Sequence, residues 1–266
     1  MLISIREVYK YEKILKSCSN KIDDDFTRTF IESQIQILLE KLRVYIESIK
    51  KKRVNSSRTL IRPILESVAD TLYILEEEDK INLKCYTYNV WHTQKFMYNI
   101  TKINKDGQII EPKELEKAIN ELMLDFKLGD NFDMLNEFIT MERNYLFKGK
   151  NRRNWFNLEN KYENTDTFLI SQVTPLGLYL YNFYSEYVHG KDIFFRLGKV
   201  KYEINYQDII AQMVILNSLG DIFYRLVKVT DTYEECANDI NALIAYNKSL
   251  EKKKENVLRK INYQDN

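Results

Sequence analysis

A row of hydrogen-bonding side chains lies on a stretch of sequence that is otherwise apolar. Tyr181, Ser185 and His189 follow one another at intervals of four residues, with Asn182 beside them. These spacings place all four side chains on one face of a helix. A buried polar group without a partner costs about 1–3 kcal/mol, so the row needs an explanation. His189 could act as a general acid or base near neutral pH, and Ser185 could position it or a substrate.

The same row also has a structural interpretation, which residue type alone favours. The four side chains could form an internal hydrogen-bond network. His189 precedes Gly190, where a positive charge would be stabilised by the C-terminal end of a helix. A hydrolase in which Ser185 is the nucleophile and His189 the base is a weaker alternative, because no acid and no elbow glycine accompany them.

A second row contains only charged side chains. Arg58, Arg62, Glu66 and Asp70 are spaced four residues apart and share one helix face. The spacing alone favours a solvated ladder of ion pairs, each worth about 0.3–0.5 kcal/mol. The arginines precede the acids, however, which is the weaker orientation for helix stability. A guanidinium held by a carboxylate is a good receptor for anions, so this row is also a candidate ligand site.

A third candidate lies in a polar segment at 148–166. It comprises Lys148, Lys150, Arg152 and Arg153, followed by Trp155 and Phe156. Basic and aromatic side chains together can hold phosphates and stack on bases. The alternative, which the short run and the neutral chain favour, is an exposed loop whose Trp155 packs into the core.

The composition limits the class of protein. With 40 Lys+Arg against 39 Asp+Glu, bulk charge predicts neither a nucleic-acid nor a membrane partner. Seven glycines and three prolines are too few for the turns of an all-β fold. Three widely spaced cysteines argue against disulfides and favour a reducing cytoplasm. We find no signal peptide, membrane span, phosphate-binding loop or metal motif, and we expect no metal and no cofactor.

The sequence therefore predicts a mainly α-helical bundle with one or two small β-hairpins. Helical periodicity is expected near 5–15, 26–49, 60–72 and 81–99, after Pro175 as far as Gly190, and from Asp208 almost to the end with a break at 230–232. The hairpins are expected at 100–110, around Lys105-Asp106-Gly107, and at 194–204. We expect one helical domain at 1–266, which allows a sub-lobe at 81–147 and a projecting C-terminal helix at 232–262.

Two of these rows resemble motifs of a known family. Arg58 to Glu66 resembles the Arg-x-x-x-Glu helix of an uncharacterised family of bacterial helical proteins. Arg153 to Phe156, followed by Tyr181 to Gly190, resembles that family's Trp and its Tyr-x-x-x-Ser-x-x-x-His-Gly motif. The family is distantly similar to the HEPN group, many of which are metal-independent ribonucleases of toxin and phage-defence systems. The HEPN arginine precedes its histidine on one helix; here Tyr181 and Asn182 occupy that spacing.

The resemblance implies a bacterial defence or toxin-type effector that acts on RNA or another phosphate-bearing ligand. Packing of two helices would then bring Arg58 or Arg62 to His189. The expected catalytic residues are His189, Arg62, Glu66 and Ser185. The expected ligand-binding residues are Arg58, Tyr181, Asn182, Lys150, Arg152, Arg153 and Trp155. The alternative is a non-catalytic sensor, antitoxin or assembly module, acting as a homodimer or with a partner protein, in which both rows are structural.

Overall fold

The computed structural model describes residues 4–103, 154–157, 167–173, 176–188 and 204–264. These residues form eight α-helices and one short 3-10 helix, and no strand occurs among them. The protein is therefore mainly α-helical, as the periodicity predicted. They fall into two compact units: one combines 1–78 with 169–266, and the other is 79–168.

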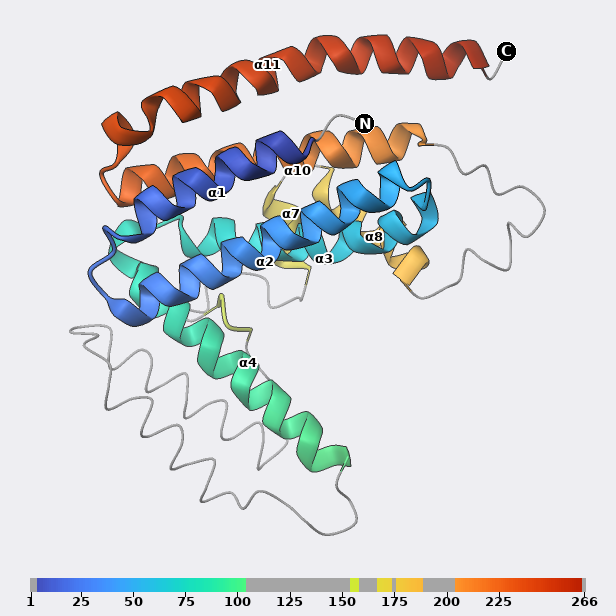
Figure 1. The fold of residues 1–266 in the computed structure, drawn as a ribbon. Helices are drawn as coiled ribbons and strands as arrows, with labels where there is room; N and C mark the ends of the chain where they lie inside the picture. Colours follow the sequence, from blue (N-terminus) through green and yellow to red (C-terminus); the bar gives the residue numbers. More distant parts are fainter. Residues whose placement is uncertain (1–3, 104–153, 158–166, 174–175, 189–203, 265–266) are drawn as a thin grey trace. The chain divides into compact units, whose positions relative to one another are not determined.

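The larger unit is a bundle around one apolar helix. Its helices are α1 (Ile5–Ser19), α2 (Asp25–Lys50), α3 (Val54–Ile74), α7 (Phe168–Val173), α8 (Gly177–Val188), α10 (Tyr206–Val229) and α11 (Tyr233–Gln264). Figure 1 shows three layers: α11, then α1 beside α10, then α2 beside α3, with α8 against α3. Helix α10 contacts α1, α3, α8 and α11, so it lies at the centre.

Helix α10 owes this central position to its side chains. Its buried residues include Ile209, Ile215, Leu219, Ile222 and Leu226. By length and composition alone the helix could also cross a membrane, but 61% of its most apolar window is buried against the rest of the protein. A long apolar helix that is largely covered in this way is what the core of a soluble protein contains.

Local sequence signals set several helix boundaries. The Asp24 side chain accepts a hydrogen bond of 2.8 Å from the Thr27 backbone N–H and so caps α2. The predicted break at 230–232 is present: α10 ends at Val229 and α11 begins at Tyr233. Asp231 turns the chain there with a positive φ of 49°.

The proline of α3 lies within the helix, not in its first turn. Pro63 follows the first residue, Val54, by nine positions. A proline inside a helix removes one backbone hydrogen bond. The Pro63 carbonyl accepts hydrogen bonds from the Lys41 ammonium at 3.3 Å and from the Ser67 hydroxyl at 3.0 Å. Side chains from α2 and α3 therefore bind the Pro63 carbonyl, whereas the carbonyl that loses its N–H donor to the proline is that of Thr59.

The smaller unit contains the 3-10 helix η1 (Glu78–Lys80) and α4 (Ile81–Ile103). Trp155 is 4% exposed, and its ring lies 4.8 Å from that of Tyr88 on α4. Phe156 stacks on Phe168 with a centroid distance of 5.7 Å. These contacts favour the core interpretation of Trp155 over a ligand-binding role.

The expectation of β-hairpins is not supported. Residues 100–103, the predicted first strand of the first hairpin, form the last turn of α4. The rest of that hairpin, at 104–110, and most of the second, at 194–203, lie outside the described residues.

Removing the cap of α2 should destabilise the protein measurably. We expect Asp24→Ala to lower the free energy of unfolding by about 1 kcal/mol, because the Thr27 N–H loses its acceptor. Asp24→Asn should retain most of the stability. Exposed Asp23 is the matched control, and Asp23→Ala should change the stability by less than about 0.5 kcal/mol. Urea denaturation measures all three, and equal losses in both alanine variants would contradict the assignment of the cap.

Candidate functional site

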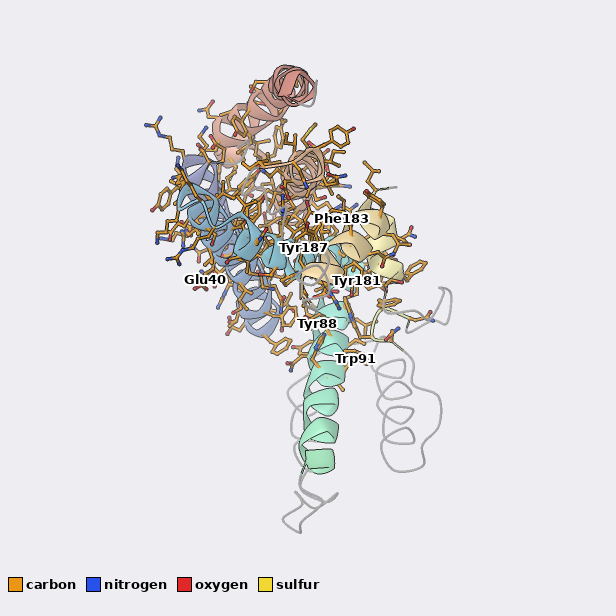
Figure 2. The ribbon with its side chains drawn as sticks, turned by 90° about the vertical axis from the view of Figure 1, so that its right-hand side faces the viewer. Glu40, Tyr88, Trp91, Tyr181, Phe183 and Tyr187 are labelled. Carbon is orange, nitrogen blue, oxygen red and sulfur yellow. The ribbon has the colours of Figure 1, made fainter. Side chains whose placement is uncertain are left out.

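Two arginines of α3 lie one turn apart, and each meets a tyrosine of α8. The Arg58 guanidinium carbon is 5.4 Å from the centroid of the Tyr187 ring, and that of Arg62 is 4.7 Å from the Tyr181 ring. Both distances are within the range of cation–π attraction. Figure 2 labels both tyrosines on α8. The two polar rows recognised in the sequence therefore lie on helices that pack together.

Arg58 belongs to a largely buried group, which we call the inner cluster: Arg58, Tyr184, Asp208 and the half-buried Tyr187. The Arg58 Nε lies 3.0 and 3.2 Å from the two carboxylate oxygens of Asp208, and its Nη2 lies 2.7 Å from Oδ2. Only 4% of Arg58 and 2% of Asp208 is exposed. A buried ion pair is favourable only when further hydrogen bonds satisfy both groups.

Those further hydrogen bonds are present. The Tyr184 hydroxyl donates to Asp208 Oδ1 at 2.9 Å, and the Asn205 backbone N–H donates to Oδ2 at 2.9 Å. Asp208 is thus also part of the capping box that begins α10. The guanidinium donates from Nη1 to Asn55 Oδ1 at 3.2 Å. The inner cluster ties α3, α8 and α10 together, which favours a structural role for Arg58 instead of the expected ligand contact.

The protonation of the inner cluster follows from this arrangement. Burial by itself would lower the pKa of Arg58, but the hydrogen bonds and charge of Asp208 outweigh it and raise that pKa above its ordinary value. Burial, and then the charge of Asp208, raise the pKa of the Tyr184 hydroxyl, which stays a donor. Neither Arg58 nor Tyr184 is therefore poised to exchange a proton near neutral pH.

One turn further along α3 lies a second group, which we call the outer cluster: Lys41, Arg62, Glu66, Asp70 and Tyr181. The Arg62 Nε donates to Glu66 Oε1 at 3.1 Å. The Arg62 side chain is 25% exposed and that of Glu66 is 42% exposed, so solvent reaches both. The carboxylate and the Tyr181 ring fix the plane of a guanidinium that a ligand can approach.

Lys41 of α2 adds a second cation to the outer cluster. Its ammonium donates to the Ser67 hydroxyl at 2.6 Å. Burial lowers the pKa of Lys41, while the charges of Glu66 and Asp70 oppose the change. Burial and the charge of Glu66 raise the pKa of Tyr181, and Arg62 opposes them. Lysine and arginine beside a phenol are groups that bind phosphate oxygens.

Neither Lys41 nor Asp208 was found by sequence reasoning. Lys41 is one of many lysines in a helical pattern, and Asp208 was noted only as the start of a helical region. Tyr184 belongs to the stretch around Tyr181 and Ser185 that the sequence analysis treats as otherwise apolar. Each joins its cluster across a distance of 20 or more residues along the chain, so no local spacing indicated it.

The other predicted site residues are placed as follows. The Ser185 hydroxyl donates to the Tyr181 carbonyl at 2.6 Å, an ordinary bond within a helix. Asn182 is exposed. His189, Lys150, Arg152 and Arg153 lie outside the described residues. Among the described residues, no three histidine, cysteine or acidic side chains are grouped so as to hold a metal ion.

Comparison with known proteins identifies a family that the chain matches. A family model described as a family of unknown function (DUF5677) matches residues 35–199, well over half of the chain. The matched range contains the whole outer cluster and ends before Asp208. No curated protein and no solved structure matches the chain.

Removing either member of the Arg58–Asp208 ion pair should lower the free energy of unfolding, and the losses from the two single substitutions should not be additive. We expect Arg58→Met or Asp208→Asn alone to lower the free energy of unfolding by about 3–5 kcal/mol, because each leaves a buried polar partner unsatisfied. The double variant should lose less than the sum of both, with a coupling free energy of about 1–3 kcal/mol.

The exposed pair of Lys13 and Asp239, joined at 2.8 Å, is the matched control. The double-mutant cycle of Lys13→Met and Asp239→Asn should give a coupling below about 1 kcal/mol. Chemical denaturation of all six variants supplies both cycles. Equal coupling in the two cycles would show that burial does not strengthen the Arg58–Asp208 interaction.

Proposed function

The chain belongs to the family of unknown function DUF5677, and we propose that in this protein the outer cluster binds a phosphate group of RNA or of a nucleotide. One observation carries the proposal. Arg62 is partly exposed, held by Glu66 at 3.1 Å, and lies over the Tyr181 ring. An arginine oriented in this way offers the fixed fork of donors that phosphate recognition uses.

Selectivity in this site would come from geometry, not from bulk charge. Two carboxylates, Glu66 and Asp70, balance the two cations of the outer cluster. A phosphate would therefore gain little from long-range attraction and much from directed hydrogen bonds. Lys41 would contribute a compact second charge beside Arg62, as lysines do in other phosphate sites.

The proposed reaction is metal-independent cleavage of RNA, as the resemblance to the HEPN group implies. The ribose 2′-hydroxyl would attack the adjacent phosphorus and release the 5′-oxygen, leaving a cyclic phosphate. Arg62, oriented by Glu66, would stabilise the negative charge that develops on the phosphoryl oxygens. His189 follows the last residue of α8, Val188, and is proposed as the proton-transfer group.

The proposed setting is the bacterial cytoplasm, in a defence or toxin–antitoxin system. Cys18, Cys85 and Cys236 are buried and free of disulfides, which is compatible with a reducing compartment. Such systems work through a second copy or a partner protein, and either is part of the proposal.

The second candidate function is a non-catalytic sensor, antitoxin or assembly module. The exposed apolar side chains at α8 favour it: Leu176, Leu178, Tyr179 and Val188 are 36–50% exposed. Exposed apolar side chains grouped on one element are typical of protein–protein contact surfaces. In this alternative, the inner cluster fixes the bundle and α8 presents an interface.

Removing the Arg62 fork should weaken RNA binding without unfolding the protein. We expect Arg62→Met to reduce affinity for a labelled single-stranded RNA about tenfold, because one charge-assisted contact is lost. The RNA affinity of Arg62→Lys should lie between those of the unaltered protein and Arg62→Met, because lysine keeps the charge but lacks the planar set of guanidinium donors. Fluorescence anisotropy in a chelating buffer measures the affinities, and thermal melting should stay nearly unchanged because the Arg62–Glu66 pair is partly exposed.

Arg28→Met is the matched control, since Arg28 pairs with the exposed Asp25 away from the outer cluster. It should bind RNA like the unaltered protein. If both methionine variants lose RNA affinity equally, the effect comes only from the change in net charge and not from the position of Arg62. Unchanged binding by Arg62→Met would remove the outer cluster from the function and favour the second candidate.

Cleavage tests the catalytic part of the proposal separately. With the full chain and RNA in chelator, we expect His189→Ala to abolish cleavage while RNA binding stays within about twofold. His92→Ala, which removes the exposed histidine of α4, should retain activity. Product analysis by gel and mass spectrometry should find cyclic phosphate ends. Full activity of His189→Ala would exclude His189 from the cleavage reaction. If the unaltered protein does not cleave RNA, only the binding part of the proposal remains.

A further inference from the structure

Pro63 lies among the residues of the outer cluster. Its carbonyl accepts hydrogen bonds from Lys41 at 3.3 Å and from Ser67 at 3.0 Å, and it follows Arg62 directly along α3. Proline is the least favourable residue type for the interior of a helix, because it has no N–H to donate and its ring crowds the carbonyl four residues earlier. The formation of α3 alone would therefore favour any other residue at this position.

The carbonyl that Pro63 leaves without its helical donor is that of Thr59. In a regular helix the N–H of residue 63 would donate to it. Within the described part of the chain, no side chain and no backbone N–H from outside α3 donates to the Thr59 carbonyl instead. The Thr59 hydroxyl is engaged elsewhere, since it donates to the Ser56 carbonyl at 2.8 Å. Thr59 is exposed, so a ligand can reach this turn of the helix.

Thr59 lies on the same face of α3 as the outer cluster. Successive residues of a helix are rotated by about 100°, which places Arg62 within about 60° of Thr59 around the helix axis. The same rotation places Glu66 and Asp70 within about 20° of Thr59. A helical carbonyl points along the axis toward the C-terminal end, so that of Thr59 points toward the turn that holds Arg62 and Pro63. The outer cluster therefore has a neutral hydrogen-bond acceptor beside its guanidinium donors.

We propose that the Thr59 carbonyl accepts a hydrogen bond from the ribose 2′-hydroxyl next to the phosphate that Arg62 binds, so that Pro63 makes the site selective for RNA over DNA. This selectivity rests on the proposed phosphate site and adds the sugar that accompanies the phosphate. The 2′-hydroxyl is the donor that distinguishes ribose from deoxyribose. A carboxylate in this place would repel the neighbouring phosphate, whereas a neutral carbonyl does not. An alanine at position 63 would supply the missing N–H and occupy the acceptor.

The donor on the ligand is tested with three single strands of one sequence: RNA, 2′-fluoro RNA and DNA. Fluorine keeps the sugar pucker of RNA but cannot donate a hydrogen bond, so it separates the donor from the shape of the strand. With the full-length protein on ice in a chelating buffer, fluorescence anisotropy should find RNA bound about fivefold more tightly than 2′-fluoro RNA, as one hydrogen bond predicts. A gel should find the RNA intact after each titration. Equal binding of RNA and 2′-fluoro RNA would overturn the proposal.

The acceptor on the protein is tested with Pro63→Ala. The restored N–H should donate to the Thr59 carbonyl, so the variant should melt about 3 °C higher and should prefer RNA over 2′-fluoro RNA by less than about twofold. A gain of stability together with a loss of selectivity cannot come from unfolding. A lower melting temperature would mean that the packing of α3 requires the proline. Either that result or an unchanged preference for RNA would overturn the proposal.

Thr59→Ala is the matched control, because it removes the side-chain hydroxyl and keeps the carbonyl. It should retain the preference for RNA, and loss of that preference would assign the contact to the hydroxyl and overturn the proposal.

Arg62→Met separates the sugar contact from the phosphate site. It should weaken the binding of all three strands by a similar factor and leave the preference for RNA in place. If Arg62→Met binds all three strands like the unaltered protein, the phosphate site and the sugar contact both fail. If Arg62→Met weakens binding but Pro63→Ala keeps the preference for RNA, only the role of the Thr59 carbonyl fails.

Discussion

The ion pair between Arg58 and Asp208 is the interaction on which the bundle's arrangement depends. It joins residues 150 positions apart and buries both charges almost completely. Such a pair is favourable only in one geometry, because a small displacement leaves a charge unsatisfied in a medium of low dielectric. Tyr184 hydrogen-bonds to the same carboxylate, so α3, α8 and α10 are held in register by one group of side chains.

The register of α8 on α3 then decides what the next turn of α3 can do. Arg58 and Arg62 are the same residue type, four positions apart on one helix, and each lies against a tyrosine of α8. Their environments differ in access to solvent. The buried Arg58 stabilises the structure. The partly exposed Arg62 can exchange a protein contact for a ligand contact with little loss of folding free energy. A rigid inner cluster beneath an accessible outer cluster is the arrangement that a precise binding site requires.

The outer cluster and a pocket of about 340 Å³ between α10 and α11 differ in the side chains that line them. The outer cluster relies on directed, charge-assisted hydrogen bonds from a guanidinium whose plane is fixed by Glu66 and Tyr181. The pocket between α10 and α11 is lined mostly by apolar side chains, and the two charged residues that line it, Asp221 and Lys248, are both exposed. Only the outer cluster lies in the part of the chain matched by the family of unknown function. The pocket is formed by the helices that follow it.

The sequence by itself determined the helices and several of their ends. Apolar periodicity located α1, α2, α3, α4, α10 and α11, and residues 230–232 marked the break before α11. These features depend on neighbours within one or two turns, which is what a local pattern records. The hairpin predicted at 100–110 was not supported, because residues 100–103 continue α4 as far as Ile103.

Only the tertiary structure decided which polar residues meet. The sequence could not show that Arg58 is buried while Arg62 is partly exposed, because burial depends on what packs against each residue and not on the spacing of the two along the helix. It could not assign Lys41 or Asp208 to a cluster, since their partners lie on other helices. Nor could it find the pocket at Gly220, which exists because α11 folds back against α10. Local patterns determine helices, whereas the contacts between distant helices create the sites.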